Sequence, residues 1–396
     1  MSLERLNAPI STPELERRWK AVRDVMAERG IDVLLMQNNN DFMGGYVRYF
    51  TDIPATTGYA TTVVFPKDDD MTIVTHAPFG TDRTITASPQ NLLRGVKRVL
   101  GHPYFCNAGY TLGPEMELAQ TALENFSGGT VGTVGTATLP HALIDGLKRG
   151  RFSNATFVDA TDAVDHIKAI KSPEELRQIR RTAQMQDGAI AAAFAAVKPG
   201  MKEIEVAAIA QAHCAAHGSE QGLYLTCSYQ PGEPVRQANR YYQNRTLREG
   251  DVFTLLVETN GAGGFYTEIG RTCILGKAPA DIVEEHEFIV AARNHTLEGL
   301  RPGMNCATVF DTYNEFLRAN GKPEEARIHC HGQGYDMVER PLVRSDEPMI
   351  LQENMNIACH PNYVTDRVFA TFCDNYIVGK EGAERIHGFE ERIVEV

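Results

Sequence analysis

The chain has 396 residues, with 39 Lys or Arg against 51 Asp or Glu, so its formal net charge is −12 at pH 7. This balance argues against a nucleic-acid partner or an anionic membrane surface, because both normally require a basic face. The longest apolar run, residues 188–197, is shorter than the ~20 residues of a membrane-spanning helix. We therefore expect two or three globular domains, with no nucleic acid and no membrane as partners.

Eight cysteines are scattered along the chain without a C-x-x-C pair, a spacing typical of reduced thiols rather than of disulfides or a zinc ribbon. The first residues, MSLERLN, are polar and lack the apolar run of a secretory signal. Both features predict a cytoplasmic protein.

The first half of the chain alternates helix and strand signals. Thr12 and Pro13 begin a helix that we expect to end near Gly30. Apolar and β-branched runs predict strands at residues 31–36, 59–65, 71–75, 130–134 and 155–159. Helices are expected at residues 115–126 and 141–148. The alternation predicts an α/β domain over residues 1–168.

The second half begins at a strong helix start, because Ser172, Pro173 and Glu175 form a capping box. We expect helices to residue 199 and at residues 204–217, 280–299 and 307–320. Asn260-Gly261 lies between two predicted strands, residues 251–258 and 264–275, and indicates a hairpin. The last eighty residues read as strands and loops. The second domain is predicted at residues 169–396.

Several short segments of the second half follow one another in a characteristic order and at characteristic spacings. They are IKSPEE (170–175), KPG (198–200), REGD (248–251), YTEIGRT (266–272), LRPG (300–303), HGQG (331–334), ERP (339–341) and NM (354–355). In this order the chain resembles the creatinase/prolidase/aminopeptidase P family, whose catalytic domain has the pita-bread fold. The resemblance implies an α/β (α+β) protein in which a smaller α/β domain precedes the pita-bread domain.

The resemblance also implies a catalytic site at the centre of the second domain. In metal-dependent members, two Asp, one His and two Glu hold a pair of divalent ions, and a water between the ions attacks the substrate. Those positions fall, in chain order, on Glu258, Glu268, His331, His360 and Cys373. Only the His is retained.

The changed residues argue against a pair of metal ions, because His and Cys turn a set of hard oxygen ligands into a mixed one. One hypothesis is a site without metal, as in creatinase, a member that also lost these ligands and hydrolyses a C–N bond with acid–base groups. The other is a single zinc-like ion held by His331, His360, Cys373 and Glu268. We expect no cofactor, with the single ion as the alternative.

Two further positions separate the chain from the peptidases of the family. Residues 239–245 replace a stretch that contains a substrate-facing His, and Val338 stands where the peptidases have a second His before Glu339. Glu339 itself is retained, either as an acid–base partner of His331 or as a structural acceptor. Tyr266 is expected to contact the substrate.

The first domain carries one more hint. In dimeric creatinase, a Phe-x-Arg of this domain reaches into the neighbour's site and holds a carboxylate. The nearest pattern here is Phe50-Thr51-Asp52, with Arg48 close by. The resemblance therefore implies substrate contacts from Phe50, Asp52 and Arg48, and it implies a homodimer.

Several candidates have a structural interpretation as well. Glu258 follows an apolar strand and is either a solvated strand end or a buried carboxylate with a raised pKa. Glu268 has Arg271 as a possible salt-bridge partner. Cys373 is a small buried residue or, if His360 lowers its pKa, a nucleophile.

His329 is a second choice beside His331, since both residues lie on the same face of a predicted strand. The arginines at 236, 240 and 245 either bind an anion or form a solvated face, and we favour the solvated face.

The leading hypothesis is a homodimeric hydrolase that acts on the C–N bond of a small amidine-, ureide- or amide-like metabolite. His331 or His360 exchanges the proton, and Glu258 and Glu268 orient the substrate or activate water. The alternatives are an Xaa-Pro-type metallopeptidase, a C–S lyase of the same fold, and a binding module without catalysis.

Overall fold

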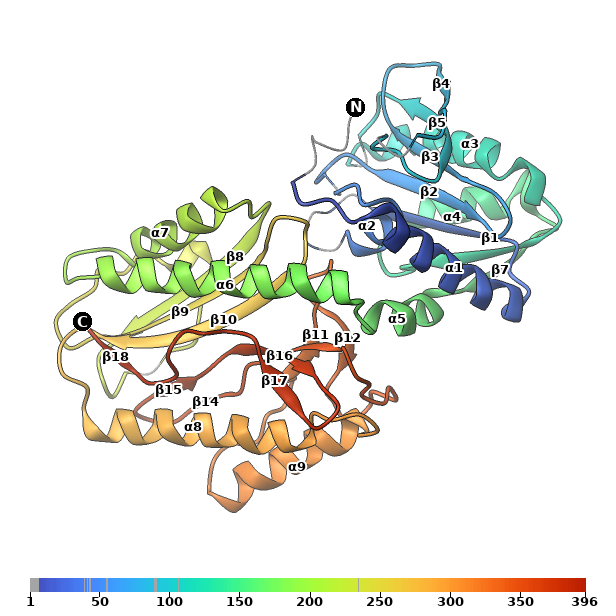
Figure 1. The fold of residues 1–396 in the computed structure, drawn as a ribbon. Coiled ribbons are helices and arrows are strands. Elements are labelled where there is room, and N and C mark those ends of the chain that lie inside the picture. The colour runs from blue at the N-terminus through green and yellow to red at the C-terminus, as the bar shows by residue number, and fades with distance from the viewer. Residues whose placement is uncertain are drawn as a thin grey trace. The chain divides into compact units, whose positions relative to one another are not determined.

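The computed structural model describes residues 7–396, apart from residues 39, 41, 43, 55, 89–90, 106 and 234. The chain forms two compact units, Met1–Lys168 and Ala169–Val396, and each has its own sheets and core (Figure 1). Both units combine helices and strands, which confirms the mixed α/β (α+β) class predicted from the sequence. No helix of the described residues combines the length and the apolar character that crossing a membrane requires.

The first unit is built on a seven-stranded mixed sheet in the order β4-β5-β3-β2-β1-β6-β7. Its strands are β1 (Val33–Asn38), β2 (Thr61–Pro66), β3 (Met71–His76), β4 (Thr81–Thr84), β5 (Val96–His102), β6 (Thr130–Val134) and β7 (Thr156–Asp159). Its α-helices are α1 (Thr12–Arg29), α2 (Gly45–Thr51), α3 (Leu112–Ala122), α4 (His141–Lys148) and α5 (Thr161–Ala169). Leu143 and Leu147 of α4 pack against Val33 and Leu35 of β1 in the core.

Helix α2 is absent from the sequence prediction, and so are β4 and β5. Nearly every residue of α2 is buried, including Val47, Tyr49 and Phe50. A short helix that is buried on all sides has no apolar stripe with a 3.6-residue period, which is the signal that sequence reasoning detects.

The second unit begins with two helices, α6 (Pro173–Ala196) and α7 (Glu203–Ala216). Ser172 and Glu175 form the predicted capping box at the start of α6. The helices cover a sheet in the order β18-β10-β9-β8. Its strands are β8 (Gly222–Tyr229), β9 (Val252–Asn260), β10 (Tyr266–Ile274) and β18 (Val394–Glu395). As expected from Asn260-Gly261, β9 and β10 pair as an antiparallel hairpin.

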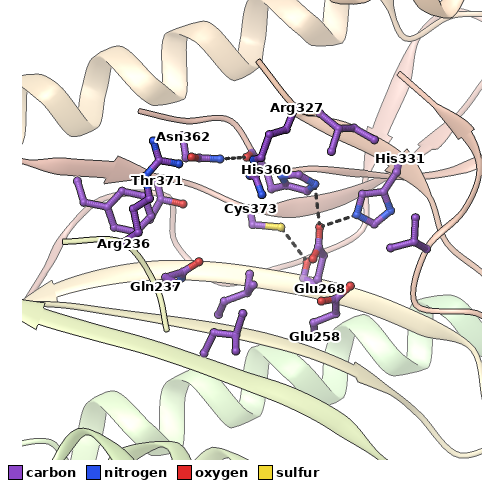
Figure 2. A pocket seen from close by; sticks show the side chains of 15 residues that line it. Arg236, Gln237, Glu258, Glu268, Arg327, His331, His360, Asn362, Thr371 and Cys373 are labelled. Carbon is purple, nitrogen blue, oxygen red and sulfur yellow. Dashed lines mark hydrogen bonds and ion pairs between the residues drawn. The ribbon is translucent and has the colours of Figure 1, made fainter. Parts of the chain in front are cut away.

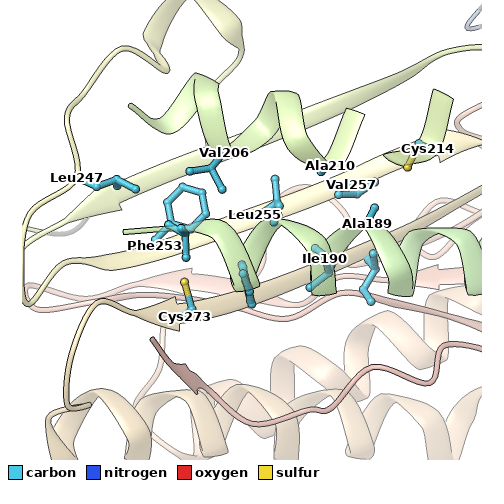
Figure 3. Packing of buried hydrophobic residues seen from close by; sticks show 14 of the residues in the cluster. Ala189, Ile190, Val206, Ala210, Cys214, Leu247, Phe253, Leu255, Val257 and Cys273 are labelled. Carbon is cyan, nitrogen blue, oxygen red and sulfur yellow. The ribbon is translucent and has the colours of Figure 1, made fainter. Parts of the chain in front are cut away.

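Strand β9 shows why this sheet has a helix face and a site face. Phe253, Leu255 and Val257 point to α6 and α7, where they form a core with Ile190 and Val206 (Figure 3). Because side chains alternate along a strand, the even-numbered residues face the other way. That second face carries Glu258.

The rest of the unit lies on the other side of this sheet (Figure 1). Two helices, α8 (Ala280–Gly299) and α9 (Cys306–Ala319), precede a five-stranded sheet in the order β12-β11-β13-β16-β17. The strands are β11 (Cys330–Gly332), β12 (Glu339–Leu342), β13 (Asn356–Cys359), β16 (Asp374–Val378) and β17 (Ala383–Arg385), and a separate hairpin is made by β14 (Asn362–Val364) and β15 (Phe369–Thr371).

Gly270 of β10 joins the two sheets. Its N–H donates to the carbonyl of Cys373 at 3.0 Å, and the Cys373 N–H donates back at 3.3 Å. A Cβ atom at position 270 would lie 3.0 Å from the Cβ of Cys373 and 3.2 Å from Leu256. The absence of a side chain here lets the β15–β16 segment lie directly against β10, beside Glu268.

Candidate active site

A cavity of about 340 Å³ lies in the second unit between the two sheets. Side chains from β8 to β10 form one wall, and residues in and around β11 to β15 form the other (Figure 2). The lining residues are Leu225, Arg236, Gln237, Leu256, Glu258, Glu268, Arg327, Ile328, His331, Val338, His360, Asn362, Phe369, Thr371 and Cys373. All five positions that the resemblance assigns to metal ligands therefore line one cavity.

Two carboxylates occupy the floor of the cavity. Glu258 and Glu268 are directly opposite each other on β9 and β10, and their exposed fractions are 7% and 2%. Burial, and then the neighbouring Glu268 carboxylate, raise the pKa of Glu258 well above its usual range. One proton shared by such a pair removes most of the repulsion, and the raised pKa makes Glu258 the side chain that favours the protonated form.

Two imidazoles face Glu268 from the opposite wall (Figure 2). The Nε2 atoms of His331 and His360 lie 3.7 Å and 3.9 Å from the same carboxylate oxygen, Oε1. His331 Nδ1 lies 3.0 Å from the carbonyl oxygen of Gly332. A carbonyl only accepts, so Nδ1 carries the proton and the Nε2 lone pair of neutral His331 points into the cavity. Burial lowers the pKa of His360 to about 4, which keeps this ring neutral.

Oε1 of Glu268 is a buried oxygen without a hydrogen-bond partner among the described residues. Its two nearest imidazole nitrogens are too far away for a direct hydrogen bond. A buried carboxylate oxygen without a donor is costly, and such atoms concentrate at functional sites. This oxygen is therefore placed to receive a proton, a donor group of a substrate or a cation.

A network of side-chain amides holds the carboxylates in place. Gln333 donates from Nε2 to Glu258 Oε1 at 3.1 Å, and Asn375 donates to Gln333 Oε1 at 2.9 Å. Asn375 Oδ1 accepts the backbone N–H of Glu268 at 2.7 Å. The two amides thus connect the side chain of one carboxylate to the backbone of the other. Sequence reasoning missed both residues, although Gln333 lies within the HGQG segment.

Cys373 lies beside Glu268, but its geometry is that of a buried thiol. Its Sγ donates to the backbone carbonyl of Glu268 at 3.7 Å. Burial, and then the negative charge of Glu268, raise the pKa of Cys373 well above its usual range. A neutral thiol is a poor nucleophile. The structure therefore gives no support to the hypothesis that His360 activates this cysteine.

The donor set does not fit the family's pair of metal ions. Among the described residues, one group of donors converges closely enough for an ion: Glu268, His331 and His360, whose ligand atoms lie within 4.8 Å of one another. Glu258 is outside this group, and Cys373 is directed to a backbone carbonyl. A dinuclear centre of hard cations relies on carboxylates, and neither His360 nor Cys373 can supply one.

Glu339 and Tyr266 do not line the cavity. Glu339 accepts from Lys171 Nζ at 2.7 Å in a buried ion pair, so its role is that of a structural acceptor. Tyr266 is fully buried. The ion pair fits the structural acceptor, one of the two roles considered for Glu339, and the buried position of Tyr266 gives no support to the predicted substrate contact.

The structure also decides the roles of Arg271 and His329, two residues close to the candidate site in the sequence. Arg271, proposed as a partner of Glu268, instead forms a salt bridge with Asp374 at 2.6 Å. His329 is fully buried, stacks on Tyr313 and lies outside the cavity lining. The histidines that reach the cavity are His331 and His360.

The residues predicted from the first domain belong to its core. Phe50 is fully buried and packs edge-on against Phe65, with 4.8 Å between ring centroids. Asp52 is 2% exposed, pairs with Arg94 at 2.6 Å and accepts the N–H of Ile10 at 3.0 Å. Arg48 is buried as well. Side chains engaged in this way are not free to enter another subunit's site, which corrects the predicted substrate contacts.

Two arginines of the cavity were not expected there. Arg236 is exposed, as we expected for its group, and it also lines the cavity; Arg327, which was not singled out, lines it as well. Arg245 of the same group pairs with Asp251, and Arg240 is exposed.

Comparisons with known proteins agree with the fold. The chain is 25% identical to the probable dipeptidase PepE of Mycobacterium tuberculosis (strain CDC 1551 / Oshkosh) over 241 residues, which cover 60% of this chain and 63% of the dipeptidase. It is 25% identical to the creatinase of Bacillus sp. (strain B-0618) over 393 residues, covering 90% of this chain and 85% of the creatinase.

The same fold is found in an X-Pro aminopeptidase from Thermotoga maritima MSB8, with a TM-score of 0.78, 16% identity, and coverage of 96% of this chain and 99% of that one. The model of metallopeptidase family M24 matches residues 177–385, which is more than half of the chain and includes every residue of the cavity. The resemblance seen in the sequence is thereby confirmed, and the chain belongs to metallopeptidase family M24.

Proposed function

We propose that the protein is a hydrolase that cleaves a C–N bond of a small amidine-, ureide- or amide-like metabolite without the dinuclear metal centre of its family. One observation carries the proposal: the unpartnered Oε1 of Glu268 faces two imidazole nitrogens on one side and lies beside a second carboxylate on the other. Such a set of weak acids and bases can both accept and deliver a proton.

Hydrolysis of a C–N bond needs two proton movements. A water molecule loses a proton as its oxygen bonds to carbon, and the nitrogen gains a proton as the C–N bond breaks. In our proposal Glu268 or His331 accepts the proton from water, because Oε1 and the His331 Nε2 lone pair face the cavity. Glu258, with its raised pKa, delivers its proton to the nitrogen, and the proton that Glu268 or His331 took from water then passes to Glu258 and restores the starting state.

A second candidate is a hydrolase with one zinc-like ion. The ligand atoms of Glu268, His331 and His360 lie within 4.8 Å of one another, and two His with one carboxylate is a known catalytic zinc set. When bound there, such an ion polarises a carbonyl and lowers the pKa of water. Cys373, expected as a fourth ligand, is not part of this group.

Metal analysis combined with a substrate screen tests the proposal. The purified protein is analysed for metals before and after chelation, and both samples are incubated with ureido, amidino and amide compounds while released ammonia or amine is measured. We expect less than one metal ion per chain and C–N hydrolysis that survives chelation. Stoichiometric zinc with activity lost on chelation would favour the second candidate, and two ions per chain would overturn both.

We further propose that the protein acts on its small-molecule substrate as a cytoplasmic homodimer. Seven buried cysteines are free thiols among the described residues, which fits a reducing compartment. Light scattering coupled to gel filtration gives the mass in solution, and a monomer at micromolar concentration contradicts the dimer.

A further inference from the structure

The cavity has a second end that the proposed chemistry does not use. Arg236, Asn362 and Thr371 gather there, away from the two carboxylates, and Arg327 extends above His360 (Figure 2). Arg236 lies in the loop after β8 and Arg327 in the segment before β11. Two cations from distant parts of the chain therefore line one side of the same cavity.

Neither arginine has a strong ionic partner. No hydrogen bond or ion pair joins Arg236 to any residue that the structure describes. Arg327 has a single carboxylate nearby, with 3.8 Å between its Nε and Glu325 Oε1. The guanidinium groups that serve the fold of this unit are paired more closely, as Arg271 is with Asp374 at 2.6 Å. Both cavity arginines are exposed, with 63% of the Arg327 side chain accessible, so their donors are open to solvent and to a ligand.

The cavity is electrically asymmetric. Its far end holds Glu258 and Glu268, which together carry negative charge even when they share one proton. An anionic group is repelled from that end and attracted to the arginines, which offer planar, forked donors suited to a carboxylate. The lining also includes the apolar side chains of Leu225, Ile328 and Phe369, which suit a short carbon skeleton.

We propose that Arg236 and Arg327 form an anion subsite that binds a carboxylate of the substrate. The substrate is then a small ureido or acylamino acid, whose carboxylate lies at the arginines and whose scissile C–N bond lies at Glu268. The assignment of the scissile bond rests on the proposed function, but the subsite is a statement about binding alone.

Matched ligands test the subsite without any need for turnover. N-carbamoylglycine and its uncharged amide, N-carbamoylglycinamide, differ only in the carboxylate, and their affinities are measured by calorimetry at low and high salt. We expect the wild-type protein to bind the acid ~10-fold or more tightly than the amide, because charge-assisted hydrogen bonds are the strong ones. Salt should reduce that preference.

The variants Arg236→Gln and Arg327→Gln, singly and together, should reduce the preference stepwise, and the double variant should bind both ligands alike. Arg240→Gln is the matched control, because Arg240 is exposed in the neighbouring segment and lies outside the cavity. Inorganic phosphate as a competitor shows whether the subsite accepts any anion.

Three results overturn the subsite: no binding of N-carbamoylglycine to the wild type, equal affinity for acid and amide, or a preference that survives in the double variant. Failure of the proposed function has a different signature. In that case the preference and its loss in the variants are observed, but no ureido, amidino or amide compound is hydrolysed.

Discussion

Two buried carboxylates, Asp374 and Glu268, lie close together in the second unit and have opposite surroundings. Asp374 is completely buried and accepts from Arg271 at 2.6 Å and from Arg385 at 2.5 Å, with Arg293 3.8 Å away. Glu268 is also buried, yet its Oε1 has no hydrogen-bond partner among the described residues. A carboxylate that serves the fold is fully paired, whereas one that serves chemistry keeps an acceptor for the substrate.

The largest expected effect is on turnover in Glu268→Gln. The change removes the charge that faces the two imidazoles, so we expect kcat to fall by ~10²–10⁴-fold on any substrate found in the screen. The unfolding free energy should not fall, because no hydrogen bond of Oε1 is lost. Steady-state kinetics and urea unfolding measure the two effects. Glu384→Gln makes the same change in an exposed carboxylate and serves as control; full activity in Glu268→Gln would refute its catalytic role.

For Asp374→Ala we expect the main effect on stability rather than on turnover. Removing this carboxylate leaves Arg271 and Arg293 buried without their shared partner, and breaking a buried ion pair from one side costs ~3–5 kcal/mol. Urea unfolding followed by circular dichroism measures the loss. A free energy of unfolding within 1 kcal/mol of the wild-type value would show that the arginines find other partners.

A smaller effect is expected for Gln333→Leu, which tests positioning rather than chemistry. Loss of the 3.1 Å hydrogen bond to Glu258 should lower kcat/KM by ~10-fold. That bond lowers the pKa of Glu258, so its removal raises the pKa further. If Glu258 donates the proton, the falling alkaline limb of the pH–rate profile then moves to higher pH. An unchanged profile with lower activity would indicate a purely structural role.

The smallest effect concerns Asp187, a paired carboxylate outside the cavity. Burial alone would raise its pKa, but the hydrogen bond and charge of His387 and the N–H groups of Gly388 and Phe389 outweigh burial and lower it. A lowered folded-state pKa contributes stability above the unfolded pKa, and this contribution is lost as the pH falls through the folded value.

We therefore expect Asp187→Asn to be less stable than the wild type by ~1–2 kcal/mol at pH 7. This difference in unfolding free energy between wild type and variant should become smaller as the pH falls below about 4. Urea unfolding at pH 7 and at a pH below about 4 measures the difference. A difference that grows in acid would contradict the lowered pKa of Asp187.

Much of the site could be predicted where the signal was local. Glu258 and Glu268 stand at fixed distances from a hairpin turn, and an antiparallel hairpin places such residues opposite each other. His331 lies in a glycine-flanked segment that the family shares. The fold class followed from the alternation of helix and strand patterns in the same way.

The sequence-based predictions were wrong where a side chain is buried or paired with a residue far away in the chain. Phe50, Asp52 and Glu339 have residue types suited to a site, but Phe65, Arg94 and Lys171 engage them inside the fold. Conversely, Arg327 was overlooked and Arg236 was assigned to a solvated face, because nothing local shows that two loops meet at one cavity. The sequence gives the chemical type of each side chain, whereas its contacts depend on which segments pack together in the fold.

For this protein the sequence by itself determined the family, the α/β class and the residue types that replace the metal ligands, since these depend on local order and spacing. Only the tertiary structure decided that Oε1 of Glu268 has no hydrogen-bond partner among the described residues while Asp374 is saturated, and that two arginines line the same cavity as the carboxylates. The physical reason is that burial and charge pairing are set by contacts between distant segments, and no local pattern encodes them.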